Sequence, residues 1–367
     1  MQNNIQVKVL FNHTSFGRIM IIFFLLAVGN VDGQQMEGYK YSPNYYNCVY
    51  IAKSADITID GDLSEKAWEK ADWSSLFVDI ENSARPAPYL DTRVKMLWDD
   101  AYLYIAAEIM ESHLWATYSK QDMEISQENS FQVFIDPEGN THNYLEIQIN
   151  TLGAVLDVFH TKPFRDSGLA INSFDFKGLK RGVRIFGTLN NPSDRDEKWT
   201  IELAIPWNEM AEKAILKGPP KDKDSWKINF LRVQWDRDIK NGKYVKQKEP
   251  QKDTEKPANN WAWSQQGSLT MHQPETWGII VFNKKADKKQ ISTVVDQDIL
   301  KWELRKVYYQ ERSFYEKYGI YTSNVQTDLS KAELEIKVLG DSYTAKYCKG
   351  RACYYIREDG RIWESKK

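Results

Sequence analysis

Two indole rings, Trp261 and Trp263, stand two residues apart in the run Asn-Asn-Trp-Ala-Trp-Ser-Gln-Gln. On a β-strand, side chains at positions i and i+2 point to the same face. Flat aromatic surfaces beside amide and hydroxyl side chains suit sugar rings, which have apolar C–H faces and polar edges. The pattern therefore indicates a ligand-binding surface, although tryptophan pairs also close the ends of β-sandwiches that bind no ligand.

Carboxylates offer a second kind of chemistry. Hydrolysis of a glycosidic bond requires two acids about 5 to 9.5 Å apart. Glu146 and Glu202 lie on predicted strands, and Asp136 ends another. Acidic residues on the strands of a sandwich most often point to solvent, so a structural role is favoured. A glycoside-active enzyme that uses these strand carboxylates is the first alternative to a binding protein.

Other catalytic signatures are missing from the sequence. It contains no G-x-S-x-G, H-E-x-x-H or G-x-x-x-x-G-K motif. The histidines after residue 33 each stand alone in their segments, as structural histidines usually do; they are His113, His142, His160 and His272. Met271 and His272 are neighbours that could serve as axial haem ligands, which leaves a haem protein as a second alternative. A structural or assembly protein is the third.

Oxygen-rich turns raise the question of calcium. The run from Asp136 to Asn140 resembles an EF-hand loop superficially, but Gly139 stands at its fourth position and Ile147 at its twelfth, where a glutamate is required. We expect a hairpin turn there. The acidic pairs at residues 60–62 and 99–100 are interpreted first as turn residues and second as ligands of a structural calcium ion.

The first 33 residues predict a secretory signal peptide. Lys8 and Arg18 precede a short apolar run at residues 19–28, and no acidic residue occurs before Asp32. The run is about half as long as a membrane-spanning helix. We therefore expect an exported protein, located in the periplasm, on the cell surface or in the medium, with no membrane span after cleavage. Residues 34–48 then form an N-terminal extension.

The chain has three cysteines, and an exported protein would meet an oxidising compartment in which they could form a disulfide. Cys348 and Cys353 flank a turn, and we expect a disulfide that joins two strand ends there. Cys48 lies in a strand-like run and is interpreted as a buried small hydrophobic residue. These spacings exclude metal sites of the C-x-x-C type.

The pattern from residue 49 to residue 283 is one of short strands separated by turn residues. No helical pattern of about ten residues separates the strands, so we predict a mainly β protein with an antiparallel, jelly-roll-like β-sandwich. Residues 63–70 and 207–213 predict two short helices. The candidate strands are residues 57–59, 93–98, 103–109, 131–135, 144–149, 155–159, 183–189, 199–205, 228–233 and 278–282.

The chain changes character after residue 283. Residues 240–260 already predict a mobile, lysine-rich loop, and residues 284–290 predict a polar linker. Apolar residues at helical spacing from Leu300 to Tyr318 then predict a helix of about 20 residues. Strands follow at residues 334–338, 343–347, 354–357 and 361–363. Residues 291–367 thus form a small α+β unit of unknown role, and a protein partner that binds through it is left open.

The composition limits the partners further. Lysine and arginine number 49 against 51 acidic residues, so no broad basic face for nucleic acid is expected. The 13 Trp, 20 Tyr and 15 Phe residues are more than the sequence alone assigns to core packing, and a surplus could supply stacking surfaces.

Six ordered segments resemble the family 9 carbohydrate-binding modules, and in particular the secreted family 9-like proteins of Bacteroidetes. The resemblance covers about residues 49–283 and implies a β-sandwich that binds glucans, xylans or their chain ends, often with structural calcium. The segments are residues 57–68, 94–104, 131–137, 199–207, 226–232 and 260–278.

The resemblance also locates candidate site residues. The family holds a sugar between two tryptophans, but the corresponding positions fall at Ile125 or Ser126 and at Met271. The family's strand carboxylate corresponds to Gln132, and its Arg-x-Asn pair corresponds to Gln148 and Asn150. Only the asparagine matches outright.

We therefore expect non-catalytic binding of a polysaccharide or its oligosaccharides, in support of polysaccharide catabolism. An association with an O-glycosyl hydrolase and binding to a partner protein are left open. The expected ligand-binding residues combine rings with hydrogen-bonding groups; they are Trp115, Trp261, Trp263, Gln132, Gln148, Asn150, Arg232 and His272. No cofactor is expected apart from structural calcium, which stays open.

Overall fold

The structure is a computed structural model, which describes residues 36, 39–52, 57–82, 85–214, 218–284, 288–327, 329, 333–350 and 352–366. The predicted signal peptide, residues 1–33, lies outside the described residues. Within them, no helix is both long enough and apolar enough to cross a membrane.

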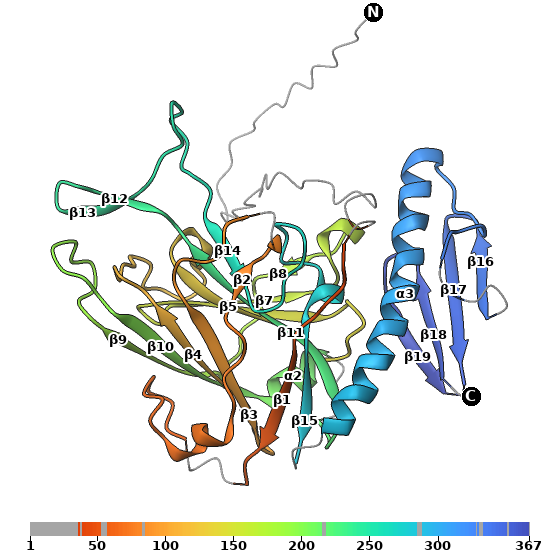
Figure 1. Ribbon diagram of the computed structural model, residues 1–367, viewed down its shortest axis with the longest axis horizontal. Helices are drawn as coiled ribbons and strands as arrows, with labels where there is room; N and C mark the ends of the chain where they lie inside the picture. The colour runs from red at the N-terminus through yellow and green to blue at the C-terminus, as the bar shows by residue number, and fades with distance from the viewer. Residues whose placement is uncertain are drawn as a thin grey trace, which may run out of the picture. The chain divides into compact units, whose positions relative to one another are not determined.

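One large curled sheet dominates the structure (Figure 1). Two short strands extend it beside β11, namely β14 (Asn259–Ala262) and β2 (Val78–Asp79). The main path runs through β8 (Ala170–Ile171), β7 (Val155–His160), β6 (Tyr144–Asn150), β5 (Ser130–Asp136), β11 (Ser225–Gln234), β15 (Gly278–Asn283), β1 (Tyr45–Tyr50), β3 (Thr92–Trp98), β4 (Tyr102–Met110), β10 (Lys198–Pro206) and β9 (Lys180–Phe186).

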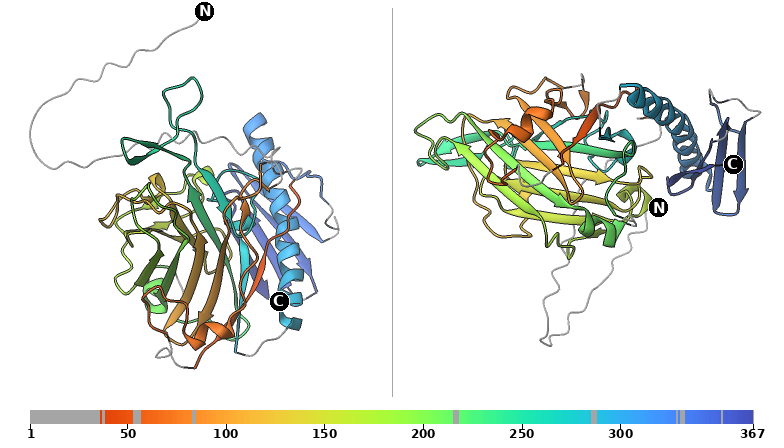
Figure 2. Two further views of the ribbon diagram at one scale, coloured as in Figure 1. Left: turned by 60° about the vertical axis from the view of Figure 1, so that its left-hand side comes forward. Right: turned by 90° about the horizontal axis from the view of Figure 1, so that it is seen from below.

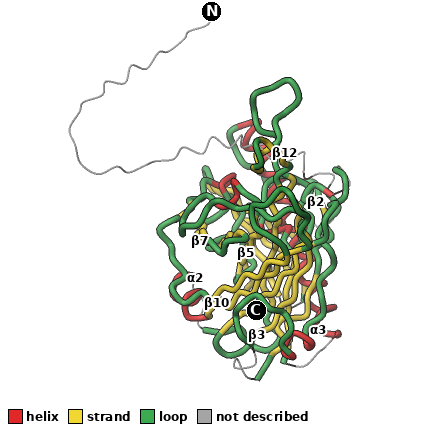
Figure 3. Tube along the Cα trace, turned by 90° about the vertical axis from the view of Figure 1, so that its left-hand side faces the viewer, coloured by secondary structure: helices red, strands yellow, loops and turns green. Residues whose placement is uncertain are grey.

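The sheet curls because each half has one apolar face that must be buried. Alternate residues of β5 and β6, such as Val133 and Ile147, join alternate residues of β3 and β10, such as Met96 and Ile201, in one core cluster. The two halves therefore pack face to face, and the strands lie in two layers when seen from below (Figure 2). Loops gather at the strand ends (Figure 3).

The predicted fold class, a mainly β protein built on a β-sandwich, is confirmed. The sheet is mixed, however, and not wholly antiparallel, because β1 pairs in parallel with both β15 and β3. This strand comes from the end of the N-terminal extension and joins the two halves of the sheet. Cys48 lies on it and is fully buried without a disulfide partner, as expected.

Several local expectations differ from the structure. Residues 57–59 form no strand, and the helix expected at residues 63–70 is a shorter 3-10 helix, η2 (Lys66–Lys70). The expected loop at residues 240–260 contains part of a hairpin, β12 (Arg237–Lys240) and β13 (Lys243–Lys246). Its turn residues Asn241 and Gly242 both have positive φ angles, which is the usual Asn-Gly hairpin signal. The helix α2 (Trp207–Ala214) matches its prediction.

A long helix, α3 (Lys288–Tyr318), follows the large sheet and has 31 residues, more than the sequence pattern predicted. It begins within the predicted linker. After it come the four antiparallel strands β16 (Leu334–Leu339), β17 (Ser342–Lys349), β18 (Ala352–Arg357) and β19 (Ile362–Lys366), close to the expected positions. Cys348 and Cys353 form a disulfide between β17 and β18.

Candidate functional site

A line of polar side chains crosses the face of β5, β6 and β7 that points away from the core. Leu145 and Ile147 of β6 lie in the core, so the alternating residues Glu146 and Gln148 point to the opposite face. Gln132 of β5 stands directly across from Gln148 in the strand register. Together with two histidines, this line makes up what we call the polar stripe, which consists of Gln132, Glu146, Gln148, His160 and His272.

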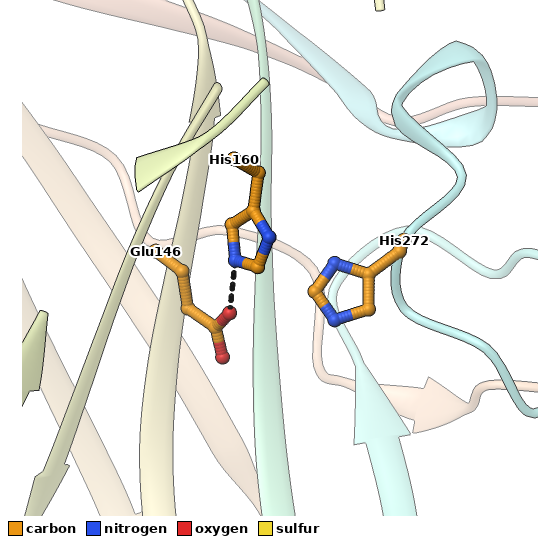
Figure 4. A group of neighbouring side chains, drawn as sticks. All are labelled: Glu146, His160 and His272. Carbon is orange, nitrogen blue, oxygen red and sulfur yellow. Dashed lines mark hydrogen bonds and ion pairs between the residues drawn. The ribbon is translucent and has the colours of Figure 1, made fainter. Parts of the chain in front are cut away.

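Hydrogen bonds and ring contacts connect the stripe. Gln148 Nε2 donates to Glu146 Oε1 over 2.6 Å, and His160 Nε2 lies 2.7 Å from Glu146 Oε2 (Figure 4). His272 comes from the segment between β14 and β15, and its ring centroid lies 4.7 Å from that of His160. The Tyr144 hydroxyl lies 3.0 Å from His272 Nδ1.

Burial and neighbouring charges set the protonation states. Burial alone would raise the pKa of Glu146, but the hydrogen bond and the charge of His160 outweigh it and lower that pKa. Burial, together with repulsion from His160, lowers the pKa of His272 to about 4. At neutral pH the stripe therefore holds one ionised carboxylate and one neutral imidazole, His272.

Residues 115–127, which precede β5 and which we call the covering segment, shield most of the stripe from solvent. The backbone N–H of Ser126, in the 3-10 helix η4 (Ile125–Gln127), donates to Gln148 Oε1 over 3.0 Å. The stripe is more open at His272, which is half-buried. Phe164, in the 3-10 helix η5 (Phe164–Asp166), is 38% exposed, and its ring centroid lies 4.7 Å from that of His272.

The two strand carboxylates considered for hydrolysis do not come together. Glu202 of β10 is also flanked by core residues on its strand, so it points outward from the other half of the sandwich. There it accepts hydrogen bonds from Trp68 Nε1 and from the Asp60 and Gly61 N–H groups. Because Glu146 and Glu202 lie on opposite outer faces with the core between them, they cannot flank one sugar.

A family model now identifies the sandwich. The model described as carbohydrate family 9 binding domain-like matches residues 59–285, more than half of the chain. The chain belongs to this family.

Part of the chain is also similar to solved structures at low sequence identity. A Bacteroides uniformis protein described as carbohydrate-binding shares 14% identity at a TM-score of 0.48, over 66% of this chain and 100% of that one. A family 9 module from Caldicellulosiruptor kristjanssonii, in complex with glucose, shares 15% identity at a TM-score of 0.43, over 67% of this chain and 98% of that one. A family 9 module from the same organism, in complex with cellotriose, shares 15% identity at a TM-score of 0.43. The match covers 66% of this chain and 96% of that one. No curated protein matches the sequence.

The expected site residues lie on two different faces of the sheet in the family 9 domain. Gln132, Gln148 and His272 belong to the polar stripe. Trp261 and Trp263 do share a face, as their spacing predicts, but it is the core face, where they are 2% and 1% exposed. Neither indole presents a ring face to solvent in this structure.

The side chains of Arg232 and Asn150 make hydrogen bonds within the domain. Arg232 is buried beside the Trp261 ring, with Nη2 3.2 Å from a carboxylate oxygen of Glu111. Asn150 donates to the Tyr118 carbonyl over 2.7 Å and is fully buried, so it fastens the covering segment to β6.

Trp115 lies in the covering segment and is 7% exposed; its indole Nε1 has no hydrogen-bond partner among the described residues.

The acidic runs at residues 60–62 and 136–140 form turns in the structure, as the sequence predicts. Asp136 accepts hydrogen bonds from the Gly139 and Thr141 N–H groups, and the Asp62 N–H donates to Asp60 Oδ1. Carboxylate oxygens of Asp60, Glu65 and Glu202 also lie within 4.8 Å of one another. That set of oxygen atoms is of the kind calcium prefers, but Glu202 already accepts three N–H groups, so the fit is partial.

The haem alternative depended on Met271 and His272. The Met271 sulfur lies 2.7 Å from Gln266 Nε2, and His272 Nδ1 lies beside Tyr144. The two neighbouring side chains therefore have separate partners in the structure.

Sequence reasoning missed the pairing of Glu146 with His160 and the position of Phe164. The sequence did contain a signal for the pairing of Glu146 with His160. A hairpin turn centred near Gly153 pairs Ile149 with Val155, which places Glu146 and the His160 end of β7 on one face. No sequence signal placed Phe164 beside His272.

Proposed function

We propose that this protein binds a carbohydrate without altering it chemically. The observation that carries the proposal is membership of the family 9 carbohydrate-binding domains over residues 59–285. The separation of Glu146 from Glu202 supports binding in preference to hydrolysis by these two acids. Glucan and xylan chains or their ends are the ligands that we propose from the family resemblance.

The carbohydrate contacts the polar stripe at its open end, beside Phe164 and His272. Phe164 offers an exposed ring for the apolar face of a sugar. Gln132 and Gln148 continue the stripe inward and supply amide donors and acceptors for hydroxyl groups. Their burial means that the covering segment must move before a sugar reaches them. Trp261 and Trp263 then act indirectly, by supporting the sheet from its core face.

The proposal includes export and a role in polysaccharide catabolism. The Cys348–Cys353 disulfide supports export, because disulfides persist mainly in oxidising compartments. Cell fractionation combined with N-terminal sequencing of the mature protein tests this part. A protein that keeps residues 1–33 in the cytoplasm would contradict it.

A glycan array followed by calorimetric titration with cello- and xylo-oligosaccharides tests the binding itself. We expect Phe164→Ala to weaken binding at least tenfold, while its thermal unfolding stays close to that of the unchanged protein. Trp363→Ala is the matched control, because Trp363 is 37% exposed and belongs to the small C-terminal sheet. Loss of binding only in Trp363→Ala would move the site to that sheet. No binding to any glycan would refute the function.

A further inference from the structure

One nitrogen of the polar stripe has no partner. His160 is 2% exposed, and its Nε2 lies 2.7 Å from Glu146 Oε2. The other ring nitrogen, Nδ1, is buried without a hydrogen-bond partner among the described residues. A buried polar atom without a partner costs free energy. His160 therefore retains a capacity to bind that none of the described groups uses.

The neighbours of His160 complete a set of metal-binding side chains. One ligand atom from each of Glu146, His160 and His272 can be chosen so that all three atoms lie within 4.8 Å of one another. Figure 4 shows the two imidazole rings and the carboxylate turned toward a common space. We propose that Glu146, His160 and His272 form a binding site for a divalent transition metal ion of the zinc type.

The donor set selects the kind of metal. Two imidazoles with one carboxylate suit zinc and its neighbours, whereas calcium and magnesium prefer oxygen donors alone. Tetrahedral zinc with ligand bonds of about 2.0 to 2.1 Å has its donor atoms roughly 3.3 Å apart. Closing the set requires a movement of at most about 1.5 Å, which His272 can make because it lies outside the strands and is itself only half-buried.

Surrounding side chains already orient the three ligands. Tyr144 holds Nδ1 of His272 and leaves Nε2 of that ring for the metal. The Tyr144 ring also stacks on His160, with centroids 4.7 Å apart and planes 13° from parallel. Gln148 binds the second oxygen of Glu146. Outer hydrogen bonds of this kind fix the ring orientation and the basicity of the ligands in metal sites.

The test uses the full chain, purified without a histidine tag and treated with a chelator, and titrates it with Zn²⁺ alone. We expect one zinc ion per chain at micromolar affinity or better, and no heat of binding with Mg²⁺. Glu146→Gln, His160→Gln and His272→Ala should each weaken zinc binding at least tenfold. His113→Ala is the control, since His113 is also half-buried but bonds Tyr244 elsewhere in the domain; its zinc affinity should not change.

A second measurement guards against loss of folding in the buried variants. Cobalt(II) in place of zinc gives visible absorption bands that report nitrogen and oxygen ligands in a low-symmetry site, and we expect these bands in the unchanged protein but not in His272→Ala. His272 is the ligand least buried, so this variant should keep the unfolding temperature of the metal-free protein. Absence of zinc binding, or equal affinity in His272→Ala and the unchanged protein, would overturn the proposal. No sugar enters the test, so its outcome is independent of carbohydrate binding.

Discussion

Gly278 and Trp263 occupy adjoining space: a Cβ atom added at Gly278 would lie 2.3 Å from Cζ3 of the Trp263 ring. Gly278 is the first residue of β15, and the indole covers it from the segment after β14. The glycine thus allows a buried tryptophan to approach the backbone of the sheet, which explains why Trp263 belongs to the core.

Gly278→Ala should destabilise the protein through overpacking. Added methyl groups in a packed core cost about 1 to 3 kcal/mol, measured here as the free energy of unfolding in urea. The same change made in a Trp263→Leu background should cost less, because the ring that clashes is gone. An equal cost in both backgrounds would show that the contact is not the cause.

Arg165→Met should be strongly destabilising, because it leaves Glu275 as an unpaired buried charge. Arg165 Nη2 lies 2.9 and 3.0 Å from the two Glu275 oxygens, and Tyr309 of α3 also donates to Glu275. Removing one partner of a buried ion pair costs about 3 to 5 kcal/mol. The double variant with Glu275→Leu should lose less stability than Arg165→Met alone, as chemical denaturation would show.

An exposed ion pair provides the control for this experiment. Lys248 and Asp253 form an ion pair in the loop between β13 and β14, where both side chains are at least half exposed. Lys248→Met should leave the free energy of unfolding unchanged, since solvent screens such pairs. A loss comparable to that of Arg165→Met would argue against burial as the reason.

Asp359 should make stability depend on pH in the acidic range. This residue lies in the turn between β18 and β19, where it accepts hydrogen bonds from Arg357 and lies 3.2 Å from His142 Nε2. Burial alone would raise the pKa of Asp359, but its contact with His142 and the hydrogen bonds from Arg357 outweigh it and hold that pKa well below its ordinary value of 3.8.

A carboxylate with a lowered pKa stabilises the fold above its ordinary pKa and loses that contribution as the pH falls below it. Asp359→Asn should therefore reduce the free energy of unfolding at neutral pH, and the difference from the unchanged protein should narrow below pH 3.8. Thermal unfolding over a series of acidic buffers measures this. Asp341→Asn, at an exposed turn position, is the control. A difference that stays constant on acidification would contradict the assignment.

The disulfide should contribute modestly to stability. Cys348 and Cys353 are separated by 5 positions in the sequence. Closing so short a loop reduces the entropy of the unfolded chain by the equivalent of about 2 kcal/mol. We expect the Cys348→Ala/Cys353→Ala variant to lose about that much free energy of unfolding and to become insensitive to reductant. Unchanged stability would mean that the bond mainly serves another purpose, such as resistance to proteolysis.

Sequence patterns determined the fold class and most of the strands. The period-two alternation at residues 131–135 and 144–149 needs only local geometry, because a strand with one apolar face must bury that face. Gln132 and Gln148 were found through the family resemblance, and the strand register then placed them opposite each other. The disulfide and the buried Cys48 also followed from local context.

Only the tertiary structure decided which face each candidate belongs to and which distant residues meet. Trp261 and Trp263 have the spacing of a binding surface, yet the pairing of β14 with β11 directs both side chains into the core. His272 reaches His160 from a distant segment, and Phe164 reaches His272 from another. Such contacts depend on how the whole chain packs, because long-range packing sets the direction of a loop, whereas periodicity describes only a residue's own strand.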